Sequence, residues 1–240
     1  MTDFLTKLIK IDNELNIPRL HQEVCEVKRV CSVLDKKEVP NCQIMNLGPI
    51  TAQKSAAKKI QVANNLLNSF RQYLSLHYGL WSLPNVQTAR IIKEKYNITS
   101  AVEVMAGNAA WSKALSMAGV KVYASDNLVW SKTSKTGGDL FYPVENLDAS
   151  SAIIKYQNCD LIICSWAPNF GHADIDLIKV WKKLEHRPKL LFVGEEFGVT
   201  NSEEFWQTVS FIKKPELASV NASFSSFDFI EERFFEIDED

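Results

Sequence analysis

Apolar residues in the first hundred positions recur at helical spacing. They step by three or four residues through Leu20, Val24, Val27, Cys31 and Leu34, so they line one face of a helix. Pro18 suits the first turn of that helix, because this turn leaves backbone N–H groups unpaired in any case. Cys31 lies within the stripe, so we expect it to be a core residue rather than a reactive thiol.

A second helical stripe follows a break at Gly48 and Pro49. Thr51 is suited to cap this helix. Its apolar face comprises Ala52, Ala56, Ile60, Ala63, Leu67, Phe70 and Leu74. After Pro84, a shorter helix is predicted over residues 86–95. The first hundred residues are therefore expected to be helical.

The pattern changes at Ala101. Residues 101–107 form a short apolar run that ends at a glycine, 109–119 have helical spacing, and 120–126 are apolar and β-branched. A strand, a helix and a strand in such close succession make a βαβ unit. This unit implies a parallel sheet with a right-handed crossover.

The rest of the chain first continues this alternation and then departs from it. Apolar runs predict strands at 160–164 and 189–193, with a helix over 174–184 between them, as expected when helices cover both faces of a sheet. After a helix over 202–212, strand-like runs occupy 217–237 with no intervening helix. Two strands in direct succession form an antiparallel hairpin at a sheet edge.

These patterns together predict an α/β fold with a Rossmann-like, doubly wound sheet. The sheet is expected to be mostly parallel, to end in an antiparallel strand pair at the C-terminus, and to follow an α-helical N-terminal extension. We place the extension over residues 1–77 and the sheet domain over residues 78–240.

The composition indicates the class of protein and the cellular compartment that we expect for it. The 240 residues are 46% hydrophobic and 23% charged, which is typical of a globular protein. No run approaches the ~18 apolar residues of a membrane-spanning helix, and no basic segment followed by an apolar run marks a secretory signal. The five cysteines are odd in number and lack zinc-knuckle spacing. We therefore expect a cytoplasmic protein with reduced thiols, no bound metal and no membrane association.

Charge is distributed unevenly along the chain. Residues 1–100 carry 14 Lys and Arg against 8 Asp and Glu, whereas residues 101–240 carry 13 against 21. The basic part could face a polyanion, or the two parts could attract one another within one chain. No block of five like charges occurs, which favours the second interpretation.

The sharpest chemical motif lies in the βαβ unit. Glu103 stands on the first strand, a turn rich in small residues follows, and Asp126 comes 23 positions after Glu103, at the end of the second strand. A carboxylate there accepts hydrogen bonds from ribose hydroxyls, at a usual spacing of about 20 residues. These features predict a nucleoside-containing cofactor.

Residues 102–126 resemble motif I of the class I S-adenosylmethionine-dependent methyltransferases. Where that family usually has Gly-x-Gly-x-Gly, this chain has Met105-Ala106-Gly107-Asn108-Ala109. A pyrophosphate needs bare backbone against it, so the missing glycines disfavour NAD. S-adenosylmethionine carries a sulfonium cation instead, which suits Glu103. The resemblance implies that the cofactor is held by Glu103, Met105, Gly107, Asn108, Asp126 and Asn127.

A second motif, Ser165-Trp166-Ala167-Pro168-Asn169, directly follows the fourth strand, at the carboxyl edge where open α/β sheets bind ligands. It resembles motif IV of amino-methyltransferases, an acidic or amide residue followed by two prolines and an aromatic. In that motif the first residue helps to hold the target amine and the aromatic stacks on the target base; here Asn169 replaces the aromatic. A loop fixed by a buried Trp166 is the alternative interpretation.

A third motif, residues 146–153, resembles the turn after the third strand of this fold. An acidic side chain there accepts a hydrogen bond from the adenine amine, and Asp148 is the candidate, with Ala149 giving a backbone contact. Asp148 is equally suited to cap the helix that starts at this point. Both roles can hold at once.

Within this class, residues 78–237 are most similar to a largely uncharacterised family of bacterial and eukaryotic Rossmann-like methyltransferases. In that family a Trp-x-x-Pro segment precedes motif I, motif IV reads Ser-Trp-Pro-Pro-Tyr, and the fifth strand runs into a Gly-Glu turn. The resemblance implies that Tyr78, Trp81 and Pro84 border the cofactor pocket. The acceptor-side candidates are Ser165, which could also contact the cofactor, Trp166, Pro168, Asn169 and Glu195, which follows Gly194.

The predicted function is methyl transfer from S-adenosylmethionine to an acceptor that the sequence does not identify. In-line transfer needs chiefly proximity and orientation, so no catalytic residue is assigned. His172 could act as a general base or simply begin a solvated helix. Small molecule, protein and nucleic acid all stay open as acceptors, and so does the oligomeric state.

Two alternative functions stay open at this point. One is a cofactor-binding or scaffold module that keeps the fold without turnover. The other, less favoured, is an NAD-dependent oxidoreductase. We expect the acceptor to bind over residues 165–169, partly covered by the N-terminal helices, whose apolar stripes must bury against something.

Overall fold

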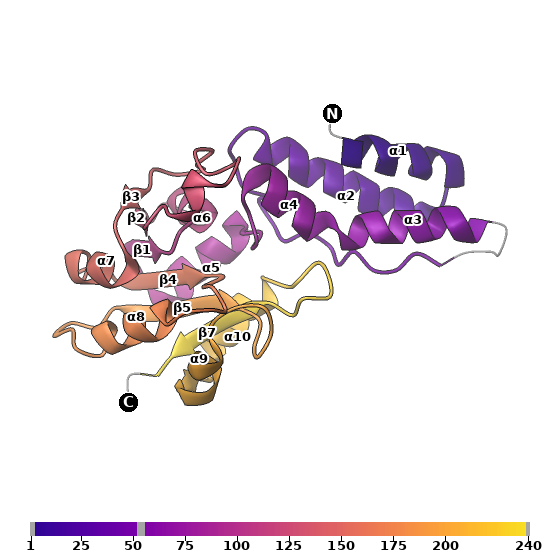
Figure 1. The fold of residues 1–240 in the computed structure, drawn as a ribbon. Helices are drawn as coiled ribbons and strands as arrows, with labels where there is room; N and C mark the ends of the chain where they lie inside the picture. Colours follow the sequence, from indigo (N-terminus) through magenta and orange to yellow (C-terminus); the bar gives the residue numbers. More distant parts are fainter. Residues whose placement is uncertain (1–2, 52–55, 239–240) are drawn as a thin grey trace.

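The computed structural model describes residues 3–51 and 56–238. Figure 1 shows the N-terminal helices gathered on one side of the molecule and the α/β sheet on the other. The N-terminal helices are α1 (Asp3–Leu15), α2 (Pro18–Leu34), α3 (Ala57–Asn68) and α4 (Phe70–Tyr78). Among residues 3–51 and 56–238, no helix has both the length and the apolar character that a membrane crossing requires.

The helical predictions for this region are confirmed in part. Helix α2 begins at Pro18 and buries the predicted stripe, including Cys31. The second stripe forms two helices rather than one, because the chain breaks at Ser69 between α3 and α4. Helix α3 begins at Ala57 and not directly after Thr51, which is therefore not its cap. Ala52, predicted to lie in this stripe, falls outside the described residues.

The sheet has seven strands in the order β3-β2-β1-β4-β5-β7-β6. The strands are β1 (Ser100–Val104), β2 (Lys121–Asp126), β3 (Glu145–Asn146), β4 (Leu161–Ser165), β5 (Lys189–Gly194), β6 (Phe211–Ile212) and β7 (Arg233–Ile237). The first five are parallel, and β7 runs antiparallel between β5 and β6. The predicted doubly wound sheet with a C-terminal antiparallel pair is confirmed.

Helices cover both faces of this sheet. On one face, α5 (Val86–Tyr96) packs with α6 (Ala110–Met117) and α10 (Pro215–Ala222). On the other face, α7 (Ala149–Lys155), α8 (Ala173–Trp181) and α9 (Glu203–Thr208) form a row. The central strands bury side chains on both faces, which explains why they are continuous apolar runs.

The C-terminal tail departs from the prediction. The expected helix over 202–212 ends at Thr208, and Phe211–Ile212 form β6 instead. Residues 215–222 form α10, so the antiparallel partners β6 and β7 do not follow one another directly. The reason is that Leu217 and Val220 are buried at a spacing of three, which suits a helix that begins with a proline.

The hydrophobic core is continuous between the N-terminal helices and the sheet. One cluster of buried residues runs from Leu20 in α2 through Phe70 in α4 to Phe234 in β7. Phe70 meets Phe227 edge to face with ring centroids 5.7 Å apart. The backbone N–H of Leu47 also donates to the carbonyl of Phe227, at 2.8 Å. The helices therefore pack directly on the segment that leads into β7.

Candidate functional site

The turn after β1 retains a glycine-type backbone despite its missing glycines. Met105, Gly107 and Ala109 have φ angles of 51°, 53° and 59°. These are the three positions at which the family that motif I resembles has glycine. A left-handed conformation costs a residue with a side chain roughly 1–2 kcal/mol. Met105 and Ala109 therefore hold a strained turn that the surrounding contacts must stabilise.

Asp126 supplies one of those contacts. At the end of β2, its Oδ2 accepts a hydrogen bond from the N–H of Gly107 at 2.9 Å, and its Oδ1 accepts one from the N–H of Leu128 at 2.8 Å. Each carboxylate oxygen has two lone-pair directions, so each retains one for a further donor. Asp126 can thus fix the turn and still accept hydrogen bonds from ribose hydroxyls.

Three buried polar atoms next to this turn have no hydrogen-bond partner among the described residues. They are Asn108 Oδ1, Ser125 Oγ and Trp130 Nε1. The carbonyl of Ser125 accepts from Ala106, and the ring of Trp130 comes within 3.9 Å of where a Cβ on Gly107 would stand. Buried polar groups are nearly always paired. The unpaired atoms and Asp126 together fit a ligand with donors and acceptors, as a nucleoside has.

Glu103 lies deeper than the sequence indicates. It is 2% exposed, and its Oε2 accepts a hydrogen bond from the N–H of Ser112 in the first turn of α6, at 2.6 Å. Burial raises the pKa of Glu103 to about 7. The side chain therefore holds α6 against β1, and its contact with a sulfonium stays a prediction.

Asn127 and Asp148, also predicted to bind the cofactor, accept hydrogen bonds from nearby residues of their own segments. Asn127 is exposed, and its Oδ1 accepts from the N–H of Val129 at 3.0 Å. Asp148 caps α7 by accepting from the N–H and the hydroxyl of Ser151, at 3.0 and 2.6 Å, which lowers its pKa. Ala149 is the first residue of that helix. The capping role of Asp148 is confirmed, and its adenine contact stays a prediction.

Tyr78 reaches the turn through its backbone only. Its carbonyl accepts from Asn108 Nδ2 at 2.6 Å, whereas its hydroxyl donates to Asp35 at 2.8 Å, at the end of α2. The neighbouring Gly79 has a φ of 70°, and a Cβ there would stand 2.2 Å from Asn108 Nδ2. The close approach of this segment to motif I therefore requires a glycine, a signal that sequence reasoning did not use.

Trp166 is the most constrained residue of the motif after β4. Its φ of 56° is unusual for a bulky side chain. Its backbone N–H donates to the carbonyl of Val193 at 2.9 Å, and its indole N–H donates to Glu232 at 2.7 Å. Its ring stacks on that of Trp81, with centroids 5.5 Å apart and planes 18° apart. The structure thus brings together two aromatic residues that the sequence separates by 85 positions.

The other residues of this motif line the carboxyl edge of the sheet. Ser165 ends β4 and is half-buried, whereas Pro168 and Asn169 are exposed. In the turn after β5, Glu195 accepts from the N–H of Val199 and of Glu231, both at 3.1 Å. This places Glu195 beside the segment before β7.

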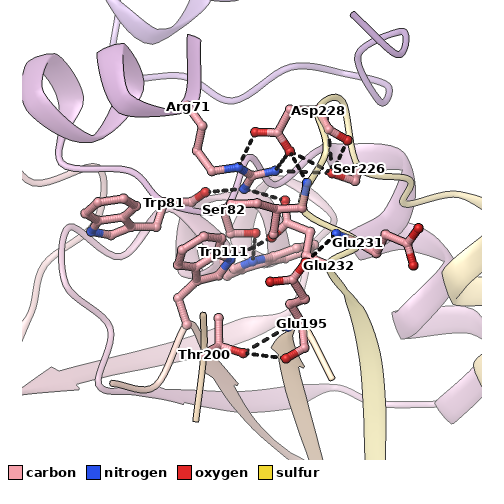
Figure 2. A network of polar contacts seen from close by, with 12 residues as sticks. Arg71, Trp81, Ser82, Trp111, Glu195, Thr200, Ser226, Asp228, Glu231 and Glu232 are labelled. Carbon is pink, nitrogen blue, oxygen red and sulfur yellow. Dashed lines mark hydrogen bonds and ion pairs between the residues drawn. The ribbon is translucent and has the colours of Figure 1, made fainter. Parts of the chain in front are cut away.

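A buried ion network beside Trp81 was not predicted from the sequence (Figure 2). Arg71 of α4 donates two hydrogen bonds to Asp228, at 2.7 and 2.8 Å, and one to Glu232 at 2.8 Å. It also donates to the carbonyl of Trp81, at 2.5 Å. All three charged side chains are at most 4% exposed. Two carboxylates share one guanidinium, so the network carries a net negative charge next to the Trp81–Trp166 pair.

The only sequence signal for Arg71 is a charge placed directly after the apolar stripe residue Phe70. His172, by contrast, lies at the N-terminus of α8 and is largely exposed. Its Nδ1 is 3.3 Å from Glu204. It therefore begins a solvated helix, and its role as a general base stays a prediction.

Strand order and the antiparallel β7 between β5 and β6 define a Rossmann-like, doubly wound fold, and Asp126 holds the left-handed turn after its first strand. No protein-family model and no curated protein matches the chain. Similar solved structures include mitomycin 7-O-methyltransferase MmcR, with a TM-score of 0.39 and 11% identity over 99% of this chain and 73% of that one.

Two further similar structures are also methyltransferases by name. Human N-acetylserotonin methyltransferase in complex with SAM has a TM-score of 0.38 and 10% identity, over 96% of this chain and 69% of that one. An S-adenosylmethionine-dependent methyltransferase from Clostridium acetobutylicum has a TM-score of 0.37 and 16% identity, over 62% and 65%. At such scores the likeness carries no weight of its own, and the fold is defined by the strand order and directions.

Proposed function

We propose that the chain is an S-adenosylmethionine-dependent methyltransferase. The observation that supports this most is the left-handed turn of residues 105–109, held by Asp126 at the carboxyl edge of a sheet whose β7 is antiparallel. Ordinary dinucleotide-binding sheets lack that antiparallel pair. A pyrophosphate would also have to approach a turn on which Met105 and Ala109 carry side chains.

The cofactor, when bound, supplies a methyl group on a sulfonium that a nucleophile can displace in line. Asp126 would accept hydrogen bonds from the ribose hydroxyls, and the unpaired atoms of Asn108 and Trp130 would meet polar groups of the ligand. The buried network around Arg71 carries an excess negative charge, which favours a cationic cofactor over an anionic one. NAD and its phosphates suit this edge less well.

The acceptor site in this proposal lies over residues 165–169. Trp166 follows β4 at the carboxyl edge, where ligands bind in open α/β sheets. Strained backbone persists only where surrounding contacts fix it, and such positions cluster at functional sites. Contacts from Val193, Glu232 and Trp81 fix Trp166 in this way.

Calorimetric titration with S-adenosylhomocysteine tests the cofactor site. We expect the wild-type chain to bind it in preference to NAD, and Asp126→Ala to bind at least tenfold more weakly, because a hydrogen bond to a charged group contributes roughly 1.5–3 kcal/mol. Asp160→Ala is the matched control. Asp160 also accepts backbone N–H bonds, but from Thr99 and Ser100 at the opposite edge of the sheet. Equal affinity in both variants would place the cofactor elsewhere.

A module that binds the cofactor without turnover is the second candidate. Strain at Met105 and Ala109, where the resembling family has glycine, favours it. Transfer of a tritiated methyl group to fractionated cell extract separates the two candidates. Labelling that Asp126→Ala abolishes supports the enzyme, whereas tight binding with no labelled fraction supports the module.

A further inference from the structure

A cavity of about 380 Å³ lies beside the candidate site, between the N-terminal helices and the segment before β7. Its walls come from α3 and α4, from Trp81, and from residues 228–230. Pockets for small molecules commonly measure about 300–1,000 Å³. The cavity is thus large enough for a ring system of one or two rings.

Two of the residues that line this cavity are aromatic and have much of their surface exposed to solvent. Trp81 is 52% exposed and Phe229 is 76% exposed. Trp166 stacks on Trp81, and Figure 2 shows the Trp81 indole extending away from the Arg71 network. Trp166 does not line the cavity, so Trp81 connects the cavity with the predicted acceptor motif. Exposed aromatic surface in a concavity is typical of a ligand site.

The facing wall is formed by uncharged polar side chains. Asn65 and Asn68 line the cavity from the end of α3, three residues apart and so on one face of that helix, and Gln72 lines it from the first turn of α4. Their side chains are exposed and form no hydrogen bond within residues 3–51 and 56–238. Three carboxamides in a row can donate to and accept from the edge of a planar ring.

The charged residues of the cavity wall are already engaged with each other. The Arg71 guanidinium uses its donors on Asp228, Glu232, Ser226 and the Trp81 carbonyl, and Asp228 accepts two of these hydrogen bonds. No lysine among residues 3–51 and 56–238 lines the cavity. These residues therefore offer no free cation to a phosphate, which disfavours an anionic ligand, and the carboxamides and the two aromatic rings of the lining are uncharged.

We propose that this cavity binds an uncharged, planar nitrogen heterocycle, stacked on Trp81 and Phe229 and hydrogen-bonded at its edge by the carboxamides. That the bound ring is the methyl acceptor rests on the proposed function, whereas the binding of the ring in this cavity does not. The ring could be a free small molecule or a base of a nucleic acid, since the recognised chemistry is the same.

Ligand-observed NMR and calorimetry on the full chain test this proposal, with S-adenosylhomocysteine added in excess to block the cofactor site. The neutral probes are cytidine and nicotinamide, and the charged probe is tryptamine. Phe229→Ala should weaken cytidine or nicotinamide binding at least fivefold. Its matched control is Phe197→Ala, because Phe197 is 65% exposed but does not line the cavity, and this variant should bind as the wild type does.

A second pair of variants tests the carboxamide wall. Gln72→Ala should weaken binding of the neutral probes. Gln61→Ala is its control and should not, because Gln61 is exposed as Gln72 is but lies on α3 outside the cavity. A short single-stranded oligonucleotide separates the two sources of the ring. Tighter binding than free cytidine, lost in Phe229→Ala, identifies a nucleic acid base, and equal or weaker binding identifies a free molecule.

The results also separate this proposal from the proposed function. Binding of S-adenosylhomocysteine without binding of either neutral probe overturns the cavity assignment alone. Probe binding that depends on Phe229, with no S-adenosylhomocysteine binding at all, overturns the methyltransferase and retains the heterocycle site. Binding of tryptamine only, or equal probe binding by the two phenylalanine variants, overturns the cavity proposal.

Discussion

Glu103→Gln is the change that tests most directly how the first strand and its helix are held. Glu103 is fully enclosed between β1 and α6, and burial raises its pKa from 4.5 to about 7, although the hydrogen bonds from Ser112 oppose the rise. Glutamine has the same size and keeps a carbonyl oxygen that can accept the Ser112 N–H. It differs in carrying no ionisable carboxyl.

The sign of the effect follows from which state binds the proton more tightly. The folded chain holds the proton of Glu103 up to a pH of about 7, whereas the unfolded chain releases it near 4.5. The stability that the neutral carboxyl contributes is complete below pH 4.5 and is lost as the pH rises to 7. A pKa rise of about 2.5, at roughly 1.4 kcal/mol for each pKa unit, corresponds to about 3–4 kcal/mol over the whole pH range.

Urea denaturation at pH 5, 6, 7 and 8, followed by circular dichroism, measures this effect. The free energy of unfolding of Glu103→Gln minus that of the wild type should grow by roughly 2–3 kcal/mol between pH 5 and pH 8, because part of the change lies below pH 5. Glu145→Gln is the control, because Glu145 is at the surface and Lys155 lowers its pKa. A difference that stays constant from pH 5 to pH 8 would show that Glu103 is ionised in the folded chain throughout, and our account of its burial would be wrong.

Three further variants test other contacts of the site. Arg71→Met should lower the free energy of unfolding in urea by about 3–5 kcal/mol, because two buried carboxylates lose their ion-pair partner. A loss under about 1 kcal/mol, as for a surface ion pair, would contradict the network. Tyr78→Phe should cost about 1 kcal/mol through the lost bond to Asp35, yet leave S-adenosylhomocysteine affinity unchanged in calorimetry; a drop in affinity would put the phenol in the pocket. Gly79→Ala should weaken that affinity by displacing Asn108 from the motif I turn, and normal binding would refute the close approach.

The parts of the fold that the sequence predicts well are those with a strong period. The βαβ unit after Ala101 and the strands later found at β4 and β5 are apolar runs bounded by glycine or polar residues. The positions of Glu103 and Asp126 on neighbouring strands follow from that unit alone. Sequence periodicity therefore predicts the strands that carry the two carboxylates, and it predicts that Asp126 ends its strand.

Other elements carry too little local information to be predicted. Strands β3 and β6 have two residues each, which is too short for an alternating pattern to repeat. The apolar run that contains Leu217 and Val220 reads as a strand or a helix, and packing against α5 decides for the helix. The positive φ of Trp166 also has no signal in residue type, because contacts with Val193 and Glu232 impose it.

Side chains to which motif comparison assigned a cofactor role also have partners within the fold. Tyr78 and Glu103 both lie beside the motif I turn, yet the phenol of Tyr78 faces α2 and the carboxyl of Glu103 faces α6. A motif specifies where the backbone runs more reliably than where a side chain points. Rotamer and partner depend on the helices packed around the turn, which lie outside the motif.

The N-terminal helices belong to the candidate site and not only to its surroundings. Phe70 packs on Phe227 within the common core, and the adjacent Arg71 binds carboxylates 157 and 161 positions away, one of which also accepts from Trp166. A single turn of α4 thus contributes to both the core and the support of the motif after β4. Deleting residues 1–45 would remove α1 and α2 and uncover this core, so it could not report on acceptor choice alone. Variants of Phe229 and Gln72 test ligand binding in the cavity apart from folding, because both of these side chains are exposed.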